Sequence, residues 1–315
     1  MKKIFYVVVC TTFFLISGIV YGQDITQSNR AGIVSGQFLK ICLSARAIAM
    51  GGAQVAVADW AQSMGYNPAG ILSVTDYGFS ATYTAWLASI QHSYAAVVKT
   101  IPGVGTIGAS VILLTTDDIE ETTPAFPEGT GRTFRASDLA FSLAYARQVT
   151  EQFRVGINGK IIQSYLFNKE LGASTFAFDI GTLYDIPILR SHIGVSLTNI
   201  GKDVQFVNEA YSLPTALRFG VLVDVLRDPS NQFVSTFQVT RLNDADEQYN
   251  LGGEYTFSST VALRLGWKFA YTQEDFTAGF GLRLNSIGLN GALDYGFNNF
   301  KYLPGTHSFT LEVGF

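Results

Sequence analysis

Residues 261–270 read VALRLGWKFA, and residues 276–284 read FTAGFGLRL. In both stretches an apolar side chain occupies every second position, and small or charged residues lie between most of them. A period of two is typical of a β-strand, because successive side chains point to opposite faces of the sheet. One face of this sheet is bulky and apolar, and the other is small and polar. A soluble barrel would turn the bulky face inward, whereas a barrel in a lipid bilayer turns it outward.

The N-terminus favours the membrane. Lys2 and Lys3 precede an apolar run over residues 4–20, and small or tolerated residues precede Gln23, which predicts a signal peptide over residues 1–22. An uncleaved membrane anchor is the alternative, but the run is at the short limit for a spanning helix. No later stretch is long enough for such a helix. The chain is therefore expected in the bacterial outer membrane, in contact with its lipid.

The same alternation recurs about fourteen times between Tyr77 and Phe315. It predicts an all-β fold, namely an antiparallel transmembrane β-barrel of about 14 strands over residues 77–315. We expect the strands at 77–88, 90–99, 104–116, 138–149, 152–165, 174–186, 189–200, 215–226, 231–240, 247–257, 260–271, 275–284, 286–297 and 306–315. Short connections alternate with longer ones, as in outer-membrane barrels with periplasmic turns and external loops. The longest connection, 117–137, is acidic and is then external.

The register also predicts which charged side chains face the lumen. They are Arg154, Lys160, Asp179, Arg218, Asp224, Arg264, Lys268, Arg283, Asp294 and Glu312. Since an unpaired buried charge is costly, these side chains are expected to pair across the interior or with a plug. A role in a substrate path is the alternative interpretation.

The segment before the barrel has a different pattern. Residues 44–70 are rich in Ala, which favours helix, and Gly51-Gly52 would end a helix. Asp59 followed by Gln62 resembles a capping box that starts a second helix. Asn67-Pro68-Ala69-Gly70 predicts a turn. Small residues would let this segment pack inside a lumen lined by Gly and Ala.

These motifs resemble the N-terminal signature of the PorV/PorQ family, a relative of the FadL-like long-chain fatty-acid transporter barrels. The residues that carry the resemblance are Arg46, Met50, Gly51, Gly52, Asp59, Asn67, Pro68 and Gly70. The resemblance implies a fourteen-stranded barrel with a partly helical hatch, residues 23–76, in its lumen. Relatives often carry a second acid after Asp59, where this chain has Trp60. The last residue, Phe315, resembles the terminal aromatic by which the barrel-assembly machinery recognises such barrels.

Two functions follow from the resemblance. In the first, the barrel acts in type IX protein secretion and surface attachment, and its partners are secreted cargo proteins and components of the secretion machinery. In the second, it transports hydrophobic small molecules, and a hydrophobic ligand is its partner. The modest length of the external loops favours the first function.

Other classes of function have little support in the sequence. Residues 103–108, GVGTIG, match a dinucleotide-binding pattern but run into a strand and not into a helix, so no cofactor and no enzyme activity are expected. The three histidines are far apart, and Cys42 is the only cysteine after residue 22, so no metal site is expected. Removal of residues 1–22 takes away two lysines and no acid, which changes the formal net charge from −4 to −6. This charge offers no basic surface for nucleic acid.

Overall fold

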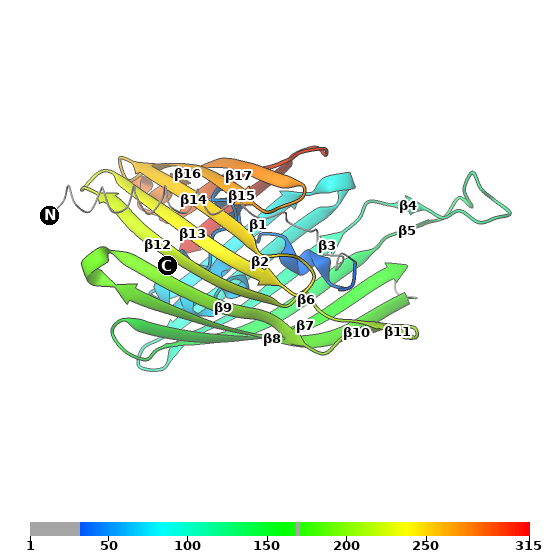
Figure 1. Cartoon of the computed structure of the whole chain (residues 1–315), viewed down its shortest axis with the longest axis horizontal. Helices are drawn as coiled ribbons and strands as arrows, with labels where there is room; N and C mark the ends of the chain where they lie inside the picture. Colours follow the sequence, from blue (N-terminus) through cyan, green and yellow to red (C-terminus); the bar gives the residue numbers. More distant parts are fainter. Residues whose placement is uncertain (1–31, 168–170) are drawn as a thin grey trace.

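Fourteen strands form one closed antiparallel barrel in the computed structural model (Figure 1), which describes residues 32–167 and 171–315. The order around the barrel is β1-β18-β17-β16-β15-β14-β13-β12-β9-β8-β7-β6-β3-β2, so the last strand closes on the first. The predicted fold class is confirmed. The predicted signal peptide, residues 1–22, lies outside the described residues.

The observed strands lie close to the predicted ones. They are β1 (Tyr77–Ala85), β2 (Gln91–Ile101), β3 (Gly105–Thr115), β6 (Ser137–Gln148), β7 (Phe153–Phe167), β8 (Leu171–Ile186), β9 (Ser191–Gly201), β12 (Ala216–Arg227), β13 (Gln232–Leu242), β14 (Gln248–Phe257), β15 (Val261–Phe269), β16 (Glu274–Arg283), β17 (Asn290–Phe300) and β18 (Thr306–Gly314). The largest difference at a strand start is in β17, which was predicted from residue 286. Residues 284–287 instead form a 3-10 turn, and Gly288 follows with φ +80°, so the strand begins later.

The two faces of the barrel wall differ as the alternation predicts. On β15, Leu263 and Leu265 are 57% and 61% exposed on the outside, whereas Ala262 and Arg264 are buried on the inside. The other strands follow the same rule, with Phe, Leu, Ile and Tyr outward. Because the outward face is bulky and apolar, the barrel has the surface of a protein in a lipid bilayer.

The longest connections lie at one end of the barrel. The predicted alternation of long and short connections is otherwise only partly confirmed, because the link 284–289 at the opposite end is longer than the link 270–273 at this end. The connection between β3 and β6 contains a two-stranded ribbon, β4 (Ile119–Glu120) and β5 (Thr133–Phe134), that projects well beyond the barrel wall (Figure 1). A second ribbon, β10 (Val204–Phe206) and β11 (Glu209–Tyr211), lies between β9 and β12. We call the end with the ribbons the outer end, following the usual arrangement of outer-membrane barrels.

Residues 32–76 fold inside the barrel, where Figure 1 shows them in blue between the strands. This segment, which we call the hatch, contains η1 (Gln37–Lys40), α2 (Ala45–Ala49), η2 (Ala61–Gly65) and η3 (Pro68–Ser73), where η marks a 3-10 helix. In the part of the chain that the structure describes, no helix has the length and apolar character needed to cross a membrane. Met50, Met64 and Ile71 of the hatch are fully buried, so the hydrophobic core lies within the lumen.

Local sequence signals explain most of the hatch. The Ser44 side chain caps α2 by accepting from the Ala47 amide at 3.1 Å, and positive φ angles at Gly51 and Gly52 follow the helix. The Asn67 side chain caps η3 by accepting from the Ala69 amide at 3.2 Å.

The capping box predicted at Asp59 and Gln62 is wrong. The element η2 begins at Ala61 after Trp60, which has φ +60° and provides no side-chain cap. The Asp59 carboxylate instead pairs with Arg46. A buried guanidinium is a stronger partner for a carboxylate than the free amides at the start of a five-residue 3-10 helix.

Glycines on the inner wall let the hatch approach the strands closely. A Cβ atom added at any of eight lumen-facing glycines would lie 2.1 to 2.5 Å from a hatch atom. These are Gly156, Gly181, Gly194, Gly220, Gly252, Gly266, Gly279 and Gly296. Because contacts this short are forbidden for a real Cβ, the absence of side chains at these positions shapes the space that the hatch occupies.

We expect Gly156→Ala to displace the hatch and to destabilise the barrel by about 1–3 kcal/mol through overpacking. Its Cβ would lie 2.4 Å from the backbone of Pro68 and Ala69. Gly159→Ala, on the same strand, is the matched control, because its Cβ would meet only the Phe178 ring at 3.6 Å. The measurement is the urea midpoint for loss of heat-modifiable migration on gels. Equal midpoints for the two variants would contradict the close packing.

Candidate functional site

Arg46 of the hatch is held by two carboxylates. Its Nε and one terminal nitrogen each donate to the Glu254 carboxylate at 2.8 Å, and the other terminal nitrogen donates to Asp59 at 2.6 Å. Glu254 belongs to β14, and both it and Arg46 are buried. The guanidinium therefore links two segments of the hatch to the barrel wall.

The ion pairs continue along the wall. Arg264 donates to Glu254 at 2.5 Å and to Asp294 at 2.6 Å, and Arg283 approaches Glu254 at 3.4 Å. Glu254 thus accepts from three arginines on the hatch, β15 and β16. We call Arg46, Asp59, Glu254, Arg264 and Asp294 the anchor cluster.

Sequence reasoning missed Glu254, the centre of the anchor cluster. Its position in β14 alternates with outward Tyr255, so the register that identified Arg264 also places Glu254 in the lumen. The predicted pairing of mixed charges is confirmed for most of the other lumen residues. The partners are Arg154–Asp185, Lys160–Asp179, Asp224–Arg227 and Lys268–Glu274, whereas Glu312 is buried with no ion pair among the described residues.

The other residues of the hatch motif hold the backbone in place. The Gly51 amide donates to Thr277 at 3.0 Å, and the Gly51 carbonyl accepts from Asn250 at 2.6 Å. Asn67 donates to the carbonyls of Val55 and Thr182, both at 2.9 Å. In the same motif, Met50 and Pro68 pack against glycines of the wall. Gly52 lies beside Asn250, and Gly70 lies beside Ala58 of the hatch.

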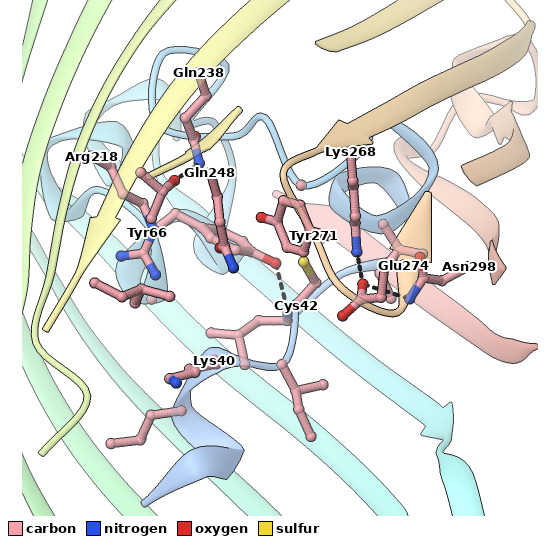
Figure 2. Close-up of a pocket in the computed structure, with 18 of the residues that line it drawn as sticks. Lys40, Cys42, Tyr66, Arg218, Gln238, Gln248, Lys268, Tyr271, Glu274 and Asn298 are labelled. Atoms are coloured by element: carbon pink, nitrogen blue, oxygen red, sulfur yellow. Dashed lines mark hydrogen bonds and ion pairs between the residues drawn. The ribbon is translucent and has the colours of Figure 1, made fainter. Parts of the chain in front are cut away.

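A cavity of about 190 Å³ opens above the hatch at the outer end of the barrel (Figure 2). Its floor is made by hatch residues that include Leu43, Gly52 and Tyr66. Its walls come from the outer ends of several strands and their loops, with the polar side chains Arg218, Gln238, Gln248, Lys268, Tyr271, Glu274 and Asn298. Leu39, Ile41, Trp86 and Leu242 add apolar surface.

The cationic groups of this outer-mouth cavity are not equivalent. Lys40 pairs with Asp244 at 2.5 Å, and Lys268 pairs with Glu274. Arg218 donates to the Thr198 hydroxyl at 2.7 Å and forms no ion pair with a carboxylate in residues 32–167 or 171–315. The cavity therefore carries one positive charge that the described residues leave without a counter-ion.

Cys42 also lines the cavity. Burial raises the pKa of its thiol, so the thiol remains protonated at neutral pH. A protonated thiol is not an activated nucleophile. Within the described ranges, no group of three or more His, Cys, Asp or Glu side chains is arranged to hold a metal ion.

Phe315 lies at the seam where the barrel closes. Its amide donates to the Tyr77 carbonyl at 2.9 Å, and the Tyr77 amide donates back at 3.3 Å. Its side chain is 76% exposed, so the seam depends on the backbone of Phe315 more than on its ring.

The closed barrel, the apolar outer face and the hatch in the lumen define the class of transmembrane β-barrels with a filled lumen. Solved structures with this fold include the toluene transporter TbuX of Ralstonia pickettii, at 13% identity and a TM-score of 0.61, over 87% of this chain and 98% of that chain. A FadL homologue of Pseudomonas aeruginosa aligns at 8% identity and a TM-score of 0.57, over 90% of this chain and 99% of that one. The CymD monoaromatic hydrocarbon channel aligns at 13% identity and a TM-score of 0.57, over 87% of this chain and 97% of that chain. At these identities the likeness shows the fold alone.

A family model narrows this class. The model described as type IX secretion system protein PorV matches residues 24–249, which is more than half of the chain. The chain therefore belongs to the PorV family, as the hatch motif predicted, and is a bacterial outer-membrane protein. No curated protein matches it.

We expect Arg46→Met to lower the free energy of unfolding by about 3–5 kcal/mol, because Glu254 would stay buried with one partner fewer. The double variant Arg46→Met/Glu254→Gln should lose less free energy of unfolding than the sum of the losses in the two single variants. Arg132→Met is the control, since the Arg132 side chain is 82% exposed and its pair with Glu121 is long, at 3.6 Å. Urea midpoints of the purified barrels provide the measurement, and strict additivity would show that the anchor cluster does not act as a unit.

Proposed function

We propose that this barrel binds exported cargo or components of the secretion machinery at the cell surface during type IX secretion. Membership of the PorV family is the observation that carries the proposal. The filled lumen supports it, because a hatch held by the anchor cluster leaves the outer surface as the part available to a large partner. The protein then acts by binding and not by catalysis.

The ribbon of β4 and β5 is the most exposed candidate for this contact. Two of its acidic residues pair within the ribbon, Asp118 with Arg135 at 2.6 Å and Glu121 with Arg132 at 3.6 Å. These pairs join the two strands of the ribbon and give two of its acidic residues a partner. Phe126 lies between these pairs and is 60% exposed. Because aromatic side chains are enriched in protein interfaces, Phe126 is a candidate contact for the partner.

Transport of a hydrophobic small molecule is the second candidate. The fold is shared with the toluene transporters, which supports it in architecture only. The interior supports it less, because the outer-mouth cavity ends on hatch residues and its wall mixes amide and charged groups with apolar ones. Transport through the barrel would require the hatch to leave the anchor cluster.

A tagged copy of the barrel, expressed in a bacterium with the type IX pathway, should co-purify with exported proteins of that pathway. Phe126→Ser should reduce their recovery several-fold, because it removes an exposed aromatic contact. Tyr302→Ser, in another outer loop and at an 84% exposed residue, is the matched control. If the wild-type barrel recovers no exported or pathway protein, the secretion role is wrong for this chain.

We also propose that the barrel-assembly machinery recognises Phe315. Phe315→Ala should lower the amount of barrel in the outer membrane several-fold and leave the stability of the assembled fraction almost unchanged, because the ring is mostly exposed. Phe309→Ala, at a lipid-facing residue of β18 that is 56% exposed, is the control for the loss of an exposed ring. Immunoblots of outer-membrane fractions measure the effect. Equal amounts for the two variants would leave Phe315 as a lipid-facing side chain only.

A further inference from the structure

We propose that the outer-mouth cavity is a binding site for a carboxylate of an extracellular peptide, with Arg218 as the group that binds the anion. The proposal deepens the proposed function, on which it rests, by stating the chemistry that the cavity recognises in a polypeptide partner. It is carried by the geometry of the cavity wall (Figure 2).

Arg218 is the first element of this site. It lies on the inner face of β12, and Figure 2 shows its guanidinium projecting into the cavity on the side of Tyr66. The Asp179 carboxylate attracts Arg218 electrostatically, but it is not a free counter-ion. It already accepts from Asn158 at 2.9 Å and from the Asn199 amide at 2.8 Å, and it pairs with Lys160 at 2.8 Å. A half-buried guanidinium without a counter-ion is costly, and its remaining donors are free to bind an anion.

The charge of the site selects a monovalent anion. Both lysines of the cavity wall are neutralised by carboxylates, Lys40 by Asp244 and Lys268 by Glu274. Arg218 alone is left to balance a ligand, and the planar guanidinium matches a carboxylate through two parallel hydrogen bonds. A phosphate with two charges would lack a second unpaired cation among these residues.

Neutral polar groups on the wall select a peptide. Asn298 donates to Glu274 at 2.9 Å, but its side-chain oxygen is buried and has no partner among the described residues. That oxygen is an acceptor suited to a peptide N–H. The Gln248 side chain makes no hydrogen bond within the described part of the chain and offers both a donor and an acceptor.

The size of the cavity excludes a long acyl chain. The volume of about 190 Å³ closes on the hatch, so only a short segment can enter from the outer end. Leu39 and Leu242 lie in the wall and can cover one apolar side chain of that segment. A peptide end with a free carboxylate and an apolar residue therefore fits the wall better than a fatty acid does.

Isothermal titration calorimetry of the full chain in detergent tests this inference, with three probes. They are acetyl-Ala-Leu-Ala with a free carboxylate, the same peptide as its C-terminal amide, and hexanoate. The free-acid peptide should bind at least about tenfold more tightly than the amide or hexanoate, as expected for the loss of a charged hydrogen bond or of the peptide contacts. Arg218→Gln should remove this preference, and Arg218→Lys should keep part of it.

Arg241→Gln is the matched control, because Arg241 is 68% exposed on the outer face of β13 and pairs with Glu247. It should bind the free-acid peptide as the wild type does, and heat-modifiable migration should show that every variant is a closed barrel. Equal binding of acid and amide, or undiminished binding by Arg218→Gln, would overturn the proposal. Hexanoate binding as tightly as the peptide would assign the site to free organic acids and would also overturn it.

The titration and the co-purification experiment fail independently. Loss of peptide binding with cargo recovery intact would reject the carboxylate site and leave the secretion role. Peptide binding without recovery of any exported protein would reject the secretion role and leave a peptide-binding cavity of another use.

Discussion

The contact between Arg46 and Glu254 is the interaction on which the rest of the interior depends. A bidentate pair buried in the lumen cannot be broken cheaply, because either partner alone would be a buried charge. It therefore ties α2, which packs mainly against β16 and β17, to β14, and Asp59 ties the next segment of the hatch to the same guanidinium. Ion pairs of this kind need not make a protein more stable than an apolar core would, but they specify one position for the hatch.

The hatch can take this position only because the wall has glycines, and so no side chains, where the hatch touches it. Glycines on the inner face of eight strands leave room for the hatch backbone, and the Gly51 and Asn67 hydrogen bonds use this close approach. The lumen is consequently a packed core, and not an open pore. The interior is packed as in a soluble protein, but the outer surface of the wall is apolar because lipid takes the place of the solvent there.

A filled lumen moves the functional surface to the outer end. The ribbon of β4 and β5 extends away from the membrane, and the outer-mouth cavity lies over the hatch. Both are built from loops and strand ends supported by a rigid wall, which is where proteins usually place recognition groups. The family to which the chain belongs acts in secretion, and these two features are among the parts of the molecule that face outward from the membrane.

The sequence by itself determined the strands, the direction of their faces and the family, because alternation, turn residues and the hatch motif are local signals. The register even assigned Arg264, Lys268 and Asp294 to the lumen, and it could have assigned Glu254 as well. Only the tertiary structure decided which charges meet, since Arg46 and Glu254 are 208 residues apart. The tertiary structure also decided the partner of Asp59, which pairs with a buried guanidinium and does not cap a helix as its local sequence predicts. It likewise left Arg218 without an ion pair, which depends on the side chains of all the surrounding strands. Pairing across a lumen is a property of the closed barrel, and no local pattern encodes it.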